Sequence, residues 1–76
     1  MNVGLLWFDG GSRNLSQKVA RAAKRYQNRF GEAPNVCYVN PNALPNGEEQ
    51  HIKGVWVRPS PRILQNHFWV GQEAAE

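Results

Sequence analysis

Apolar residues recur at steps of three and four residues between Asn14 and Gly31, which is the period of an amphipathic helix. Asn14 is a good N-cap and forms a capping-box pattern with Gln17, three residues further along the chain. Gly31 is a natural C-terminal stop, and Pro34 prevents the helix from continuing. The pattern therefore predicts one helix whose buried stripe consists of Leu15, Val19, Ala22, Ala23, Tyr26 and Phe30.

Four further apolar segments predict strands. Residues 3–8 and 35–39 are apolar on both alternating faces, a pattern typical of strands that are internal to a sheet. Residues 52–58 predict a third strand, in which Gly54 indicates a bulge or a close backbone approach and Ile52 faces away from the valines. Residues 63–70 predict the fourth strand, either continuous or split at Gln65 and Asn66.

The predicted order is strand, helix, strand, strand, strand. A strand–helix–strand unit of this length favours a crossover that leaves its two strands parallel. We therefore expect an α+β fold, a two-layer sandwich with one mixed four-stranded sheet and one amphipathic helix on one face. Residues 1–71 would form a single domain, and residues 72–76 a frayed C-terminal tail.

One helix of this size leaves part of the sheet uncovered. A sixteen-residue helix is about 24 Å long and about 10 Å wide, so it covers about two strands of one face. The opposite face would be open although the first two strands are apolar on both sides. Either the last two strands curl over it or a second subunit packs there.

Composition narrows the class of protein. The chain has 76 residues, which is one domain, and its single cysteine excludes an intrachain disulfide. The longest apolar run, residues 3–8, is too short for a membrane span or a signal peptide, so we expect no membrane association. A cytoplasmic location is expected, and the free thiol agrees with a reducing compartment.

Three segments of the chain resemble a group of short uncharacterised bacterial proteins. These segments are residues 3–7 (VGLLW), 33–41 (APNVCYVNP) and 66–71 (NHFWVG). The resemblance spans most of the chain. It implies a small, stand-alone bacterial protein, and it carries no activity and no functional residue to transfer.

Charge is distributed unevenly, and the helix carries most of it. The net charge is +3, but residues 10–31 carry six cations and no acid, whereas the remainder has a net charge of −3. A basic helix face of this kind can bind the phosphate backbone of a nucleic acid with weak sequence selectivity. The alternative is that the face is simply exposed to solvent. The candidate nucleic-acid-binding residues are Arg13, Lys18, Arg21, Lys24, Arg25 and Arg29.

The loop before the helix is a candidate anion site. Free amide groups and the helix dipole favour the binding of anions at the N-terminus of a helix that follows a strand. Neither phosphate-loop motif is present, so a flexible turn is the alternative. The candidate residues are Gly10, Gly11, Ser12 and Arg13, directly after Asp9.

Catalytic and metal sites are not indicated. Cys37 lies in a predicted strand among apolar residues, so a buried cysteine is favoured over a nucleophile. His51 and His67 have no paired spacing that is typical of a metal site. We expect no catalytic residue, no metal and no cofactor.

The large aromatic residues leave three alternatives, namely core, dimer interface and base-stacking platform. Trp56 and Trp69 lie on the last two predicted strands, which the helix is least able to cover. The sequence thus favours a small non-catalytic interaction module that forms a homodimer, with Trp56 and Trp69 at the interface. Nucleic-acid binding through the helix is the alternative, and an anionic ligand at the Asp9–Arg13 loop is third.

Overall fold

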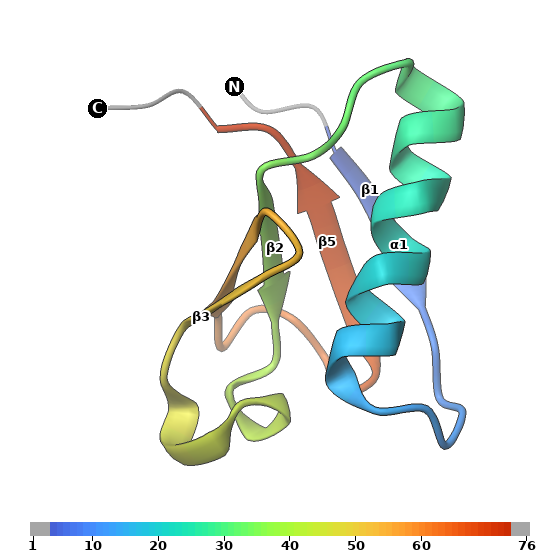
Figure 1. Ribbon diagram of the computed structural model, residues 1–76. Helices are drawn as coiled ribbons and strands as arrows, with labels where there is room; N and C mark the ends of the chain where they lie inside the picture. The colour runs from blue at the N-terminus through green and yellow to red at the C-terminus, as the bar shows by residue number, and fades with distance from the viewer. Residues whose placement is uncertain (1–3, 74–76) are drawn as a thin grey trace.

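The computed structural model describes residues 4–73 and shows one helix packed on one face of a five-stranded sheet (Figure 1). The α+β two-layer assignment is confirmed, although the sheet has five strands and not four. The elements in chain order are β1 (Gly4–Phe8), α1 (Leu15–Phe30), β2 (Val36–Val39), η1 (Pro41–Ala43), η2 (Pro45–Gly47), β3 (Gln50–Ile52), β4 (Val55–Pro59) and β5 (His67–Gly71).

Local side-chain chemistry sets both ends of α1. The Asn14 side chain accepts a hydrogen bond from the Gln17 amide at 2.9 Å, and the Gln17 side chain accepts one from the Asn14 amide at 3.2 Å. At the other end Gly31 adopts the left-handed conformation, with φ of 78°, and its N–H donates to the Gln27 carbonyl. The predicted helix and both of its caps are confirmed. This helix is neither long nor apolar enough to cross a membrane, and residues 4–73 contain no other α-helix.

The strands lie in the order β1-β5-β2-β4-β3. Strands β1 and β2 are both antiparallel to β5, so they are parallel to each other, as the strand–helix–strand pattern predicts. They are not neighbours, however, because β5 lies between them. The prediction that both are internal is correct for β2 and wrong for β1, which is an edge strand. An apolar pattern on both faces of a strand describes the side chains above and below the sheet. It does not indicate whether the strand has a neighbour along each of its two edges.

The predicted strand 52–58 is a hairpin. Lys53 and Gly54 both have positive φ, 51° and 84°, and this geometry reverses the chain between β3 and β4. Gly54 therefore forms a tight turn and not a bulge. Ile52 pairs with Val55 across the hairpin, so it lies on the same face as the valines, contrary to the prediction.

Strand β5 begins later than predicted, at His67. The preceding residues form a turn in which Asn66 has a φ of 65° and the His67 N–H donates to the Leu64 carbonyl at 3.1 Å. Gln72 and Glu73, assigned from the sequence to the frayed tail, are hydrogen-bonded to the segment before β2. The rest of that predicted tail, 74–76, lies outside the described residues.

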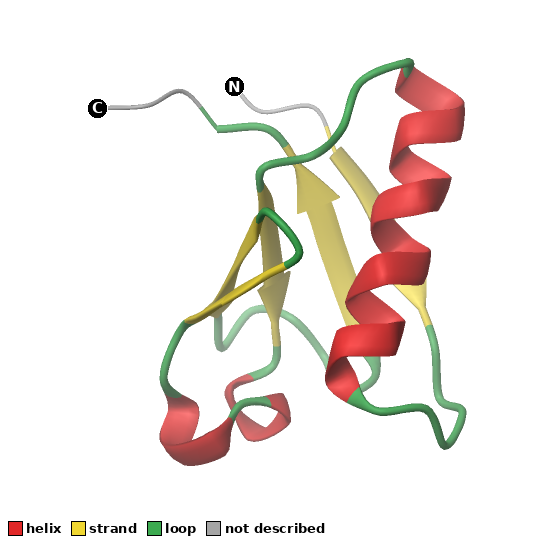
Figure 2. Ribbon diagram, in the orientation of Figure 1, coloured by secondary structure: helices red, strands yellow, loops and turns green. Residues whose placement is uncertain are grey.

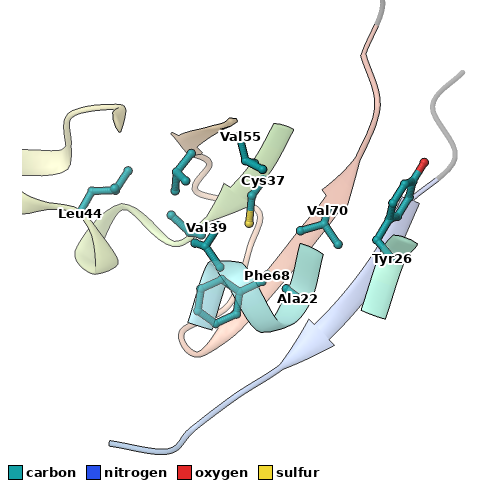
Figure 3. Packing of buried hydrophobic residues seen from close by; sticks show 10 residues of the cluster. Ala22, Tyr26, Cys37, Val39, Leu44, Val55, Phe68 and Val70 are labelled. Atoms are coloured by element: carbon teal, nitrogen blue, oxygen red, sulfur yellow. The ribbon is translucent and has the colours of Figure 1, made fainter. Parts of the chain in front are cut away.

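The core lies between α1 and the sheet. Val19, Ala22 and Tyr26 of the helix are buried, as the three-four spacing predicts, and α1 packs mainly on β5 and β1, with Ala22 near Phe68 and Val70 (Figure 3). The loop with the two short 3-10 helices follows β2 at the end of that strand, apart from α1 (Figure 2). Its Leu44 is buried in the same cluster, and thus extends the core where α1 does not reach.

Candidate interaction surfaces

The face of the sheet that points away from α1 carries a row of aromatic and apolar side chains. Cross-strand pairing places Leu6 opposite Trp69, and Trp69 opposite Tyr38, so these three lie on one face. The same alternation places Phe8, His67, Trp56 and His51 there. Leu6, Phe8 and Trp56 are 59%, 61% and 42% exposed. We call this surface the open sheet face.

Aromatic contacts connect neighbouring strands across the open sheet face. The ring centroids are 5.1 Å apart for Phe8 and His67, and 4.5 Å apart for His51 and Trp56. Tyr38 and Trp69 are 5.9 Å apart at the centre of the sheet. These distances are typical of attractive aromatic pairs, and they connect β1 with β5, β5 with β2, and β3 with β4.

Gly4 has a specific role on this face. A Cβ atom at this position would overlap the indole ring of Trp69. The missing side chain therefore lets the indole lie across the start of β1, where Trp69 is half-buried.

A polar cluster around Glu73 closes one part of the open sheet face. The Tyr38 hydroxyl donates to Glu73 at 2.5 Å, and Arg58 Nη1 lies 3.3 Å from the other carboxylate oxygen. Arg58 Nε also lies 3.5 Å from Glu49. The hydrogen bond to Glu73 is the largest of several effects that raise the pKa of Tyr38. This phenol therefore stays protonated at neutral pH, and Arg58 is matched by two carboxylates.

The cations of α1 lie on the opposite side of the molecule. Arg21 and Arg25 are exposed, as predicted, and so are Arg13, Lys24 and Arg29, while Lys18 is half-buried. None of the six forms an ion pair with a carboxylate among residues 4–73. The aromatic side chains of the open sheet face and these cations thus point in different directions. One surface cannot use both to hold a nucleic acid.

The loop before α1 is occupied by its own side chains. The Gly11 amide donates to Asp9 Oδ1 at 3.0 Å, and the Asn14 side chain takes the Gln17 amide at the first turn of α1. Gly10, Gly11, Ser12 and Arg13 are exposed around it. An incoming anion would meet the Asp9 carboxylate, so the geometry adds no support to the predicted anion site.

The sheet separates the residues considered for catalysis or metal binding. Cys37 points into the core and is fully buried, and burial raises the pKa of its thiol to about 12. His51 and His67 lie on the open sheet face, on the other side of the backbone. Within residues 4–73 no three potential ligands come together as a metal site.

Sequence reasoning named Trp56 and Trp69 for this surface and missed Leu6, Phe8 and His67. Leu6 and Phe8 form one of the two alternating sets in β1, but assigning β1 to the interior of the sheet hid their exposure. The contacts of Glu73 left no signal, because a polar residue near the end of a chain predicts no particular partner. The chain matches no protein-family model, no curated protein and no solved structure.

Proposed function

We propose that this protein is a non-catalytic interaction module that forms a homodimer through the open sheet face. The observation that supports it is the exposed row from Leu6 and Phe8 on β1 to Trp56 on β4, which no element among residues 4–73 covers. Leu6 and Phe8 form an exposed apolar patch at one edge of the face, Trp56 is exposed on β4, and exposed apolar patches mark interaction sites. We also infer a cytoplasmic location, since Cys37 is a free thiol.

The size of the open sheet face suits a second copy. Five strands at about 4.8 Å spacing and about 17 Å length give a face of roughly 400 Å² in projection. Side-chain relief raises the accessible area above this value. Standard interfaces bury about 800 Å² per partner, so a dimer through this face would be small, in the size class of weak association.

Charge on the open sheet face also favours a second copy. Its cation, Arg58, is matched by Glu49 and Glu73, so two copies can approach without strong repulsion. Two-fold packing of sheet on sheet at about 10 Å would bring the indoles of Trp56 and Trp69 into the interface. The basic sides of both helices would then point outward, away from each other.

Sedimentation velocity over a wide range of concentrations tests the proposal. Trp56→Glu introduces a charge on the open sheet face and should shift the population toward monomer. Leu6→Glu tests the other end of the face in the same way. Gln27→Glu adds the same charge to an exposed position of α1 and should leave association unchanged. Wild-type protein that stays monomeric at high micromolar concentration would overturn the proposal.

A further inference from the structure

One flank of α1 carries a row of cations along the edge of the sheet. Lys18, Arg21, Arg25 and Arg29 follow one another at intervals of three and four residues, so they lie on one side of the helix. The guanidinium carbon of Arg25 lies 4.9 Å from the centre of the Trp7 ring. This contact places Arg25 over β1, the edge strand, and Figure 1 shows α1 running in front of that strand.

A groove separates this flank from β1. It has a volume of about 250 Å³ and is lined by Leu5 of the strand and by Arg25, Asn28 and Arg29 of the helix. It therefore combines an apolar wall, two guanidinium groups and a side-chain amide. No acidic residue among residues 4–73 lines it.

The outer edge of β1 has free backbone groups. Strand β1 pairs with β5 on one side, and no strand among residues 4–73 pairs with its other side. The Asp9 N–H donates to the Asn66 carbonyl across the ladder. In an antiparallel ladder the direction alternates, so the N–H and C=O groups of Leu6 and Phe8 point outward. Such an edge is a template for another strand.

We propose that the groove and the β1 edge together bind an extended acidic peptide, which adds to the sheet as a sixth strand. The spacing of charges fits this partner. Two residues that are four apart on a helix are separated by about 6 Å along the helix axis. Alternate side chains of a strand are separated by about 6.6 Å along the strand. Acidic side chains on every second residue of the peptide can therefore reach Arg25 and Arg29 in succession, while its backbone pairs with Leu6 and Phe8.

A peptide fits this surface better than a nucleic acid does. The β1 edge offers alternating donors and acceptors, and a peptide backbone is complementary to that pattern, whereas a phosphate backbone carries acceptors only. The aromatic residues suited to base stacking lie on the open sheet face. The groove is also a different surface from the proposed dimer interface, so either proposal can fail without the other.

The test uses a labelled eight-residue peptide that alternates Glu with Val, and fluorescence anisotropy at low ionic strength. Arg25→Glu and Arg29→Glu should each weaken its binding about tenfold or more, since each removes a charge-assisted contact. Lys24→Glu makes the same change in charge at an exposed position that does not line the groove and should have a smaller effect. The amide resonances of Leu6 and Phe8 should shift when the peptide binds.

Two further ligands separate strand addition from plain charge attraction. A peptide of equal charge with proline in place of two valines cannot pair with the edge and should bind much more weakly. Equal binding of both peptides would overturn the proposal. A single-stranded oligonucleotide that binds more tightly and displaces the acidic peptide would reassign the surface to nucleic acid. Absence of peptide binding at low salt would also reject the proposal.

Discussion

Removing the Tyr26 ring should destabilise the protein more than most single substitutions. Tyr26 is only 4% exposed, packs in the core cluster and lies 4.6 Å from the ring of Phe30. An aromatic ring that buries about 150 Å² contributes roughly 3–4 kcal/mol at about 25 cal/mol per Å². We therefore expect Tyr26→Ala to lower the free energy of unfolding by about 3 kcal/mol, at the lower end of measured aromatic-to-alanine losses.

The effect is large compared with the total stability. A domain of 76 residues has a free energy of unfolding of about 4–11 kcal/mol. A loss of about 3 kcal/mol should lower Tm by about 12–24 °C. Thermal melts followed by circular dichroism measure this, at one fixed protein concentration because self-association would also raise Tm.

Tyr26→Phe is the matched control. The Tyr26 hydroxyl has no hydrogen-bond partner within residues 4–73, so its removal should change Tm by only a few degrees. The reasoning would be refuted if Tyr26→Ala left Tm unchanged, or if Tyr26→Phe were as destabilising as Tyr26→Ala. Either result would mean that the stripe of α1 does not form the core.

Three other substitutions test local features. Lys53→Asn should stabilise the protein by about 0.5 kcal/mol and Gly54→Ala should destabilise it by about 1 kcal/mol, since both positions have positive φ; denaturant titrations measure both. Asn14→Ala should cost about 1 kcal/mol in the same titrations through loss of the N-cap, and unchanged stability would contradict the capping argument. Burial raises the pKa of the Cys37 thiol to about 12 from its ordinary value of 9.0. Above pH 9 the thiol ionises in the unfolded chain but stays neutral in the folded protein, so its contribution to stability is complete below pH 9 and is lost between pH 9 and 12. Between pH 7 and pH 10 the wild type should lose about 1.4 kcal/mol more than Cys37→Ala does, and equal losses would contradict this assignment.

Much of the fold follows from local patterns. The helix is determined by its own caps and apolar period, so Asn14, Gly31 and the buried stripe could be predicted together. The α+β class follows from one such helix among apolar strand segments. The parallel direction of β1 and β2 follows from the helix that connects them.

Long-range pairing could not be predicted from these patterns. Insertion of β5 between β1 and β2 depends on which edges meet in three dimensions, and no local residue encodes it. The hairpin at Lys53 and Gly54 was missed because a lysine at positive φ is uncommon and gives no turn signal. Leu6 is exposed because β1 lies at the edge of the sheet. Its exposure could therefore not be predicted either.

The central proposal is that two copies meet through the open sheet face. The most direct measurement is a set of intermolecular nuclear Overhauser effects in a mixed sample of isotope-labelled and unlabelled protein. Contacts from the indoles of Trp56 and Trp69 to Leu6, Phe8 or Tyr38 of the other copy are the predicted result. A sample that shows no intermolecular contacts at millimolar concentration, or contacts only at the outer side of α1, would contradict the proposal.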